Sequence, residues 1–475
     1  MASLLRTEPS PGRSSANRVG DWWLVAVAAL VGAIALVGLP ARATYSTRTT
    51  ADEPQYLLSA ISLAEDFDLD ISDELRTERY RPFHEVTLDQ QTIGLDDSGR
   101  QVSPHDPLLP LLLAFPMAIG GWVGAKLALA AIAAATAALT AALAHRRYDV
   151  APSTAAIATV SCFAGLPLAG YGTQVYPEMP AAFLTLVMVA GLTTPSADRR
   201  SATLTMVALI AIPWLAVKYV PVAAVGGIAL LWQLRQRPTW LAWTTLGAAV
   251  GAVTYLVAHQ WVYGGWTVYA AGDHFISTGE FSAVGTNVNL LGRSRRLIGL
   301  LVDRDFGIAA WSPVWFLLPI AAAKAWVDKS AASMLLIWLL VATWLNATFV
   351  ALTMHGWWMP GRQLVVALPI GILLIAHWAN ASRNRTRILT LLGFIGLFNW
   401  VWLALEGSTG RRTLIVDFDQ TASWPYRAIA PLLPDGLTGG NRNDLLLVAW
   451  LATVGVISAI AHRVRAPDPG DATDG

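Results

Sequence analysis

Long apolar segments repeat along almost the whole chain, and they restrict its fold more than any other feature. About twelve segments reach or approach the roughly 20 residues that an α-helix needs to cross a bilayer. They are residues 22–40, 122–144, 152–170, 180–194, 202–216, 220–234, 240–262, 308–325, 331–352, 362–380, 388–406 and 443–462. Since a chain in lipid must satisfy its own backbone hydrogen bonds, the sequence predicts an all-α polytopic membrane protein with about 12 transmembrane helices.

The composition agrees with a membrane protein. Of the 475 residues, 55% are hydrophobic and only 14% are charged, which excludes an ordinary soluble enzyme. The net charge of +1 gives no support for nucleic-acid binding. The single cysteine, Cys162, excludes an internal disulfide framework and a cysteine-based zinc site.

Lysine and arginine clusters predict the orientation, because such clusters favour the cytosolic side. If the spans alternate, all the clusters fall on one face. They are Arg6, Arg13 and Arg18; Arg146 and Arg147; Arg199 and Arg200; Arg235 and Arg237; Lys324 and Lys329; Arg383, Arg385 and Arg387; and Arg463 and Arg465. We therefore expect cytosolic tails at 1–21 and 466–475 around a single membrane domain at 22–465, located in the plasma (inner) membrane. The long outer loops are then about 41–106, 263–307 and 407–441.

Two boundaries are less regular. Residues 213–221 could form a tight turn between the fifth and sixth spans, or a kink in one long helix, because prolines stand at both ends. The apolar stretch from Leu108 to Gly121 is short for a span and is predicted to be re-entrant or interfacial.

The first outer loop opens with two adjacent carboxylates, Asp52 and Glu53, directly after the first span. Residues 54–63, with Tyr56 on one side, are predicted to form a short interfacial amphipathic helix that holds these carboxylates at the rim of the bilayer. Catalysis is one interpretation. The alternatives are a solvated acidic loop and carboxylates that only cap the helix.

Other outer segments carry charges that could act with these carboxylates. Glu178 follows a proline in the turn between spans three and four, and Lys218 lies between spans five and six. Lys218 is either part of a functional site or an anchor that reaches the interface. His105 and Asp106 precede the stretch that re-enters the membrane.

Several arginines lie in the predicted outer segments, although lysine and arginine are normally enriched on the cytosolic side. Residues 289–304 have leucines at helical spacing and are predicted to form a second interfacial helix, in the fourth outer loop, that carries Arg293, Arg296 and Arg304. Guanidinium groups bind phosphate through two parallel hydrogen bonds, so they could hold a lipid phosphate or only contact anionic headgroups. A further outer turn at 354–362 contains His355 and ends at Arg362.

The order of these features resembles the GT-C superfamily of integral-membrane glycosyltransferases, which includes protein O-mannosyltransferases and aminoarabinose transferases. The resemblance rests on short motifs spread over most of the chain: Asp52-Glu53-Pro54 with Tyr56, residues 104–110, Pro177-Glu178, residues 303–307 (Asp-Arg-Asp-Phe-Gly) with Pro313, and Gly361-Arg362 before Pro369. It implies a GT-C-like fold with Asp52 as general base and Glu53 as its neighbour or substitute. In relatives similar to the aminoarabinose transferase, Lys-Pro stands where this chain has residues 105–107 (His-Asp-Pro).

The implied reaction moves a sugar from a polyprenyl-phosphate donor to a hydroxyl of a glycan, lipid or protein on the extracytoplasmic face, with inversion. A positioned carboxylate can accept the proton, and cations can stabilise the leaving phosphate. The candidate substrate- and phosphate-binding residues are Lys218, Arg293, Arg296, Arg304, Arg362, His355, Tyr56, His105 and Glu178. A divalent cation could bind through Glu178, His105 or Asp106, although no ligand spacing is diagnostic of a metal. The membrane lipids are the other expected partners.

Two other classes also fit twelve spans, namely a secondary transporter of a small solute and a noncatalytic scaffold of the cell envelope. No internal repeat relates the two halves of the sequence, and few charges fall at mid-span, where transporters place their sites.

Overall fold

A computed structural model describes residues 20–94, 99–194, 198–270, 289–351, 353–354, 358–436 and 440–463. In this part of the chain the helices are α1 (Trp22–Leu36), α2 (Glu53–Glu65), α3 (Ser72–Arg76), α4 (Leu108–Tyr148), α5 (Pro152–Phe163), α6 (Leu168–Tyr171), α7 (Glu178–Leu192), α8 (Arg199–Leu215), α9 (Val220–Leu234), α10 (Pro238–Tyr263), α12 (Leu290–Ser294), α13 (Arg296–Val302), α14 (Ile308–Trp311), α15 (Leu317–Asp328), α16 (Ala331–Phe349), α17 (Leu368–Ala379), α18 (Arg383–Ser408), α19 (Trp424–Ile429) and α20 (Asn441–Arg463). Short 3₁₀ turns include η2 (Val217–Tyr219) and η5 (Arg362–Leu364).

The predicted helical membrane architecture is confirmed in outline. Among the described residues, six segments are long and apolar enough to cross a membrane, and four shorter apolar helices accompany them. The six are Leu108–Tyr148, Val217–Leu234, Pro238–Tyr263, Ala331–Phe349, Arg383–Ser408 and Asn441–Ile460; the four are Trp22–Leu36, Pro152–Phe163, Glu178–Leu192 and Leu368–Ala379. The chain is an integral membrane protein, and the number of about 12 spans stays a prediction.

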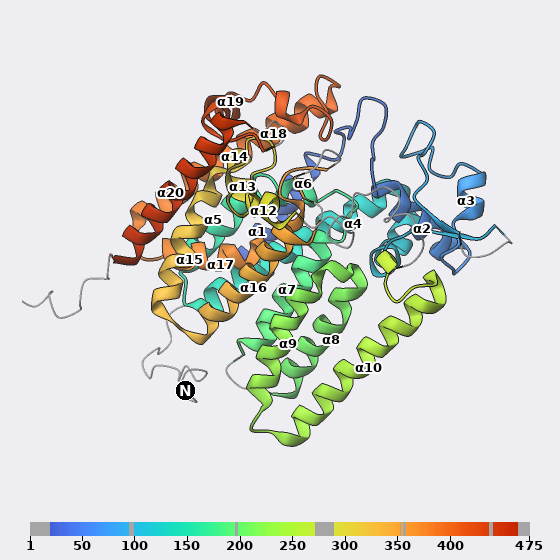
Figure 1. The fold of residues 1–475 in the computed structure, drawn as a ribbon, viewed down its shortest axis with the longest axis horizontal. Helices are drawn as coiled ribbons and strands as arrows, with labels where there is room; N and C mark the ends of the chain where they lie inside the picture. Colours follow the sequence, from blue (N-terminus) through green and yellow to red (C-terminus); the bar gives the residue numbers. More distant parts are fainter. Residues whose placement is uncertain are drawn as a thin grey trace, which may run out of the picture.

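The helices divide into a packed centre and a periphery. α4 packs against α1, α2, α7 and α17 and forms the centre of the bundle. In Figure 1, α10 runs along one edge beside α8 and α9, and α20 lies on the opposite side of the bundle. Only 11% of the apolar window of α10 and none of that of α20 is buried within the protein, compared with 50% for α4. Helices that are apolar on their outer surface require lipid around them, so α10 and α20 face the bilayer.

α4 is divided in two at Gly121. This residue has φ 57° and ψ −154°, a backbone conformation that is essentially restricted to glycine. The break falls at the boundary predicted for the apolar stretch that begins at Leu108. The fifth and sixth spans are two helices as well, because Ala216 is extended between α8 and η2.

Two predicted interfacial helices differ from expectation. α2 forms where a helix was predicted, but every residue from Glu53 to Ser62 is buried, including Gln55 and Ser59. α2 is therefore enclosed by the protein and does not lie with one face on the bilayer. The arginine-bearing helix is not continuous either: it consists of α12 and α13, which meet at Arg295.

A short antiparallel ladder departs from an all-α fold. β1 (Ile93–Gly94) pairs with β2 (Gln101–Val102), with Ile93 opposite Val102. An isolated bridge from Asp70 to Val102 ties this ladder to the segment between α2 and α3. The first long loop is thus organised around α2, as the right side of Figure 1 shows.

The break in α4 predicts different outcomes at two adjacent glycines. Gly121→Ala forces an L-residue into a conformation reserved for glycine and should cost about 1–3 kcal/mol of stability. Gly120→Ala is the matched control, because a Cβ there meets nothing within 4 Å and φ is not positive, so it should be neutral or slightly stabilising. Thermal unfolding of the two variants in detergent measures the difference, and equal midpoints would contradict the break.

Candidate active site

The Arg362 guanidinium connects two carboxylates that are far apart in the sequence. Its Nη2 donates to Oδ2 of Asp52 at 2.8 Å, and its Nε donates to Oε1 of Glu178 at 2.9 Å. Nζ of Lys218 donates to the same Glu178 oxygen at 2.8 Å. Four residues predicted from the sequence therefore form one network in which cations and carboxylates alternate.

These four charges are largely removed from solvent, and to different degrees. The side chain of Glu178 is fully buried, and those of Arg362 and Lys218 are 7% and 11% exposed. Burying a charge costs several kcal/mol unless a partner compensates it, which explains why each member touches an opposite charge. Asp52 is the most accessible member at 19%, so it is the carboxylate that a substrate can reach.

Backbone and aromatic contacts fix the position of Arg362. Gly361 has φ 72°, and a Cβ there would lie 2.6 Å from a side-chain carbon of Ile308, so only glycine suits the turn into η5. The guanidinium carbon lies 4.0 Å from the ring centre of Tyr176 and 4.8 Å from that of Trp358. Cations are attracted to aromatic faces, and these rings hold the arginine in line with both carboxylates.

Asp52 precedes α2 but does not cap it, because its side chain makes no hydrogen bond to the first turn. Its Oδ1 lies 3.8 Å from Nε2 of His105. The other nitrogen of that imidazole pairs with Oγ of Ser103 at 2.7 Å, and the ring packs 4.4 Å from that of Tyr56. Burial by itself raises the pKa of the Asp52 carboxyl, but Arg362 and His105 hold that pKa well below its usual range. Asp52 is therefore ionised at neutral pH.

Glu53 has a different environment. Its Oε2 accepts the backbone N–H of Thr50, and its Oε1 accepts that of Val175 at 2.9 Å. The residue is 1% exposed. Glu53 thus binds the backbone of the segments before α2 and α7 and caps neither helix. A catalytic role for Glu53 stays a prediction that these contacts do not favour.

Asp106, just before α4, joins the start of that helix to the segment that carries Lys218. Its Oδ1 accepts from Tyr255 at 2.7 Å and pairs with Nε2 of His259 at 2.8 Å, and its Oδ2 accepts the backbone N–H of Val217 at 3.1 Å. Sequence reasoning missed this role. The available signal was a tyrosine and a histidine four residues apart on the otherwise apolar α10.

The suggested cation ligands do not converge in the described part of the chain. Glu178 bonds with Arg362 and Lys218, and the Asp106 oxygens are held by α10 and by backbone. His105 contacts Ser103 and Asp52. These contacts give no support to a metal held by Glu178, His105 and Asp106.

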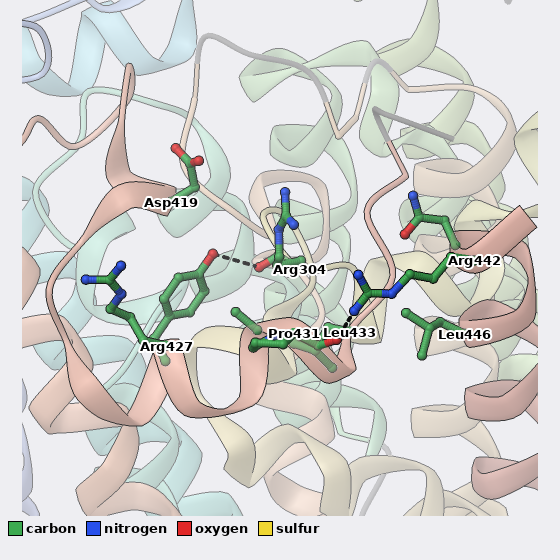
Figure 2. Close-up of a pocket in the computed structure, with 10 residues that line it drawn as sticks. Arg304, Asp419, Arg427, Pro431, Leu433, Arg442 and Leu446 are labelled. Atoms are coloured by element: carbon green, nitrogen blue, oxygen red, sulfur yellow. Dashed lines mark hydrogen bonds between the residues drawn. The ribbon is translucent and has the colours of Figure 1, made fainter. Parts of the chain in front are cut away.

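Arg304 lines a separate pocket of about 400 Å³. Its Nη2 donates to Asp435 at 2.6 Å and its Nε to Asp305 at 3.2 Å. Figure 2 shows Arg304 in this pocket with Arg427 and Arg442. The Tyr426 hydroxyl of α19 donates to the backbone oxygen of Arg304 at 3.3 Å. None of the residues that line the pocket belongs to the Asp52 network.

The remaining predicted cations also lie outside that network. Arg293 is buried in α12 and donates to the backbone oxygen of Phe349. Arg296 begins α13 and is partly buried. His355 lies outside the described residues.

An apolar groove of about 480 Å³ lies next to the segment that carries His105 and Asp106. α2, α4 and α8 line it through residues that include Leu63, Leu111 and Ile210. Its wall also contains Pro107 and Trp214. Pro107 directly follows Asp106, so the groove adjoins the segment in which His105 faces Asp52.

Comparison with solved structures shows where this architecture recurs. The crystal structure of ArnT from Cupriavidus metallidurans bound to undecaprenyl phosphate matches with a TM-score of 0.52 and 14% sequence identity, covering 93% of this chain and 72% of that one. The chain has an ArnT-like fold. The apo structure of the same ArnT matches with a TM-score of 0.48, 14% identity and the same coverage. No protein-family model and no curated protein sequence matches the chain. The predicted resemblance to the aminoarabinose-transferase group of the GT-C superfamily is confirmed as a likeness of fold to ArnT.

The shared Glu178 carboxylate predicts a strong effect on stability. Glu178→Gln removes the carboxylate that Arg362 and Lys218 share and leaves Asp52 to compensate both buried cations. This change should lower the free energy of unfolding by about 3–5 kcal/mol. Glu178→Gln/Lys218→Met removes one of these cations as well and should cost clearly less than the sum of the single changes. Denaturation midpoints in detergent measure both effects.

Asp328→Asn is the control for this experiment, because it breaks an i,i+4 pair with Lys324 in which both side chains are partly exposed. Such a pair contributes at most about 1 kcal/mol. A Glu178→Gln variant no less stable than Asp328→Asn would show that the four charges do not stabilise one another.

Proposed function

We propose that this protein is a membrane glycosyltransferase that moves a sugar from a polyprenyl-phosphate donor to a hydroxyl acceptor, with Asp52 as the general base. The observation that carries the proposal is the Asp52 carboxylate, 19% exposed, which shares Arg362 with the buried Glu178–Lys218 pair. An apolar groove adjoins the His105–Asp106 segment that faces it. This arrangement provides a base, cations for a phosphate and a surface for a lipid chain in one place.

The groove suits the lipid portion of the donor. Its lining residues are apolar, and Leu111 and Val207 are largely exposed along it. This surface suits the apolar isoprenoid chain of the donor. Asp106 bonds to the backbone of Val217, so the loop that ends the groove also positions Lys218. A phosphate at the head of the groove would thus face Lys218 and Arg362.

The reaction follows from this placement. The acceptor oxygen attacks the anomeric carbon as the bond from that carbon to the phosphate oxygen breaks, and the configuration inverts. The acceptor proton passes to Asp52, and the leaving phosphate retains the electron pair of the broken bond. Cations that are already positioned in a water-poor site stabilise the charge that develops on the phosphate.

Arg362 links the two halves of this reaction. Without substrate it holds the pKa of Asp52 low, which makes the carboxylate a weak base. A donor phosphate competes for the same guanidinium, and its binding weakens the bond from Arg362 to Asp52. The pKa of Asp52 then rises toward its ordinary value, so the base becomes stronger when the donor is present.

The ArnT-like fold supports a lipid-linked donor, since that structure contains undecaprenyl phosphate. The orientation bias of lysine and arginine supports an extracytoplasmic position of the network, and we infer that the membrane is the plasma (inner) membrane. There the acceptor would be a glycan, a lipid or a protein, because nucleotide sugars are not normally available on that side. The transporter and scaffold hypotheses lack a comparable supporting contact.

Asp52→Asn should lower transfer by about 10²- to 10⁴-fold, because it removes the general base. It keeps a hydrogen-bonding group near Arg362, so undecaprenyl phosphate should still bind. Mass spectrometry of lipid-linked sugars in cells that express the wild type, Asp52→Asn or no protein measures the effect. The same donor should accumulate in the last two strains.

The matched control for Asp52→Asn is Glu78→Gln, which neutralises an acid that is paired with Arg81 in the same loop. It should leave the lipid-linked sugars as in the wild type. If the protein is a scaffold, the donor should not accumulate in the Asp52→Asn strain. If it is a transporter, the uptake of a soluble solute should change instead. Either result would overturn the transferase proposal.

A further inference from the structure

Three carboxylates converge at the end of α2 that lies away from Asp52. One oxygen each from Asp66, Asp73 and Glu74 lies within 4.8 Å of the others. Asp66 follows the last residue of α2, and the other two lie in the first turn of α3. The cluster therefore joins the ends of two helices, which lie side by side in Figure 1.

One oxygen of the buried Glu74 carboxyl group lacks a hydrogen-bond partner. The residue is 2% exposed, and its Oε2 is buried without a hydrogen-bond partner. The Arg79 guanidinium donates to Glu65 at 2.8 Å and interacts with Glu74 and Asp73 through its charge. A buried carboxylate oxygen without a partner, beside two further carboxylates, is a suitable ligand for a cation.

We propose that Asp66, Asp73 and Glu74 bind a divalent cation, with Ca²⁺ as the best fit. Three carboxylate oxygens are hard ligands that suit Ca²⁺, Mg²⁺ or Mn²⁺ and not softer metals. Ca²⁺ binds oxygen at about 2.3–2.6 Å, so two ligands of one ion can lie up to about 5 Å apart. The separations of at most 4.8 Å meet this limit. Mg²⁺ usually takes only one or two carboxylates and keeps several waters, so three carboxylates favour Ca²⁺.

The two aspartates leave room for the rest of a coordination shell. Asp66 and Asp73 are exposed, so water can supply the further ligands that Ca²⁺ takes. The ion would join the C-terminus of α2 to α3 and neutralise the repulsion among the carboxylates. Since Asp52 immediately precedes α2, the same ion would stabilise the helix that carries the proposed base, without contacting the substrate.

The test is thermal unfolding of the full-length protein in detergent, in EDTA and with CaCl₂ up to about 10 mM, which is well above the weakest dissociation constants of extracellular calcium modules, about 10⁻³ M. The midpoint of the wild type should rise with Ca²⁺ and saturate, and Mg²⁺ should act more weakly. Glu74→Gln should weaken the apparent Ca²⁺ affinity about 10-fold or more. Glu78→Gln, an identical change four residues away at an acid paired with Arg81, should retain it.

If Glu74→Gln does not fold, Asp73→Asn replaces it, because that side chain is exposed and its loss leaves no cavity. Asp52→Asn should keep the full Ca²⁺ response, which separates this site from the proposed transfer reaction. The proposal is overturned if Ca²⁺ leaves the wild-type midpoint unchanged, or if Ca²⁺ shifts the midpoints of wild type and cluster variants equally.

Discussion

The bond from Arg362 to Asp52 and Glu178 is the interaction on which the rest of the site depends. A guanidinium that is 7% exposed cannot remain in this protein without anionic partners. Its two carboxylates come from the segment before α2 and from the start of α7, and Lys218 joins through Glu178. Folding must bring all four segments together to satisfy these charges, so the site is also a stabilising centre of the fold.

Packing around the network gives it one geometry. Gly361 allows the turn that aims Arg362, and Tyr176 and Trp358 cover the guanidinium. Asp106 ties the stretch before α4 to the backbone next to Lys218. These are contacts between loops, but each loop ends on a helix of the bundle, and the helices therefore set the distances between the charges.

Much of this could be predicted from sequence, because charge is costly in an apolar chain. Asp52, Glu178 and Arg362 stand out at the ends of apolar segments, and all three meet in the network. Their pairing could not be predicted, since Asp52 and Arg362 are 310 residues apart. Pattern alone could not separate the roles of Asp52 and Glu53, because these depend on tertiary contacts. Glu53 accepts two backbone N–H groups, whereas Asp52 pairs with Arg362. Arg304 was also a reasonable candidate, yet its partners are Asp305 and Asp435.

Periodicity failed where the structure encloses a segment on all sides. α2 was expected to present one apolar face to the bilayer, yet its polar residues, such as Gln55 and Ser59, are buried as well. The sequence also has acidic residues directly after this segment, among them Asp66, Asp73 and Glu74. Their convergence depends on the turn from α2 to α3, which hydropathy does not encode.

The most direct test is a cryo-EM structure of the protein with undecaprenyl phosphate. The account predicts that the phosphate lies within hydrogen-bond distance of Arg362 or Lys218, that the chain follows the groove past Trp214, and that the bond from Arg362 to Asp52 lengthens. A phosphate held in the Arg304 pocket, with Arg362 still bound to Asp52 at 2.8 Å, would contradict it.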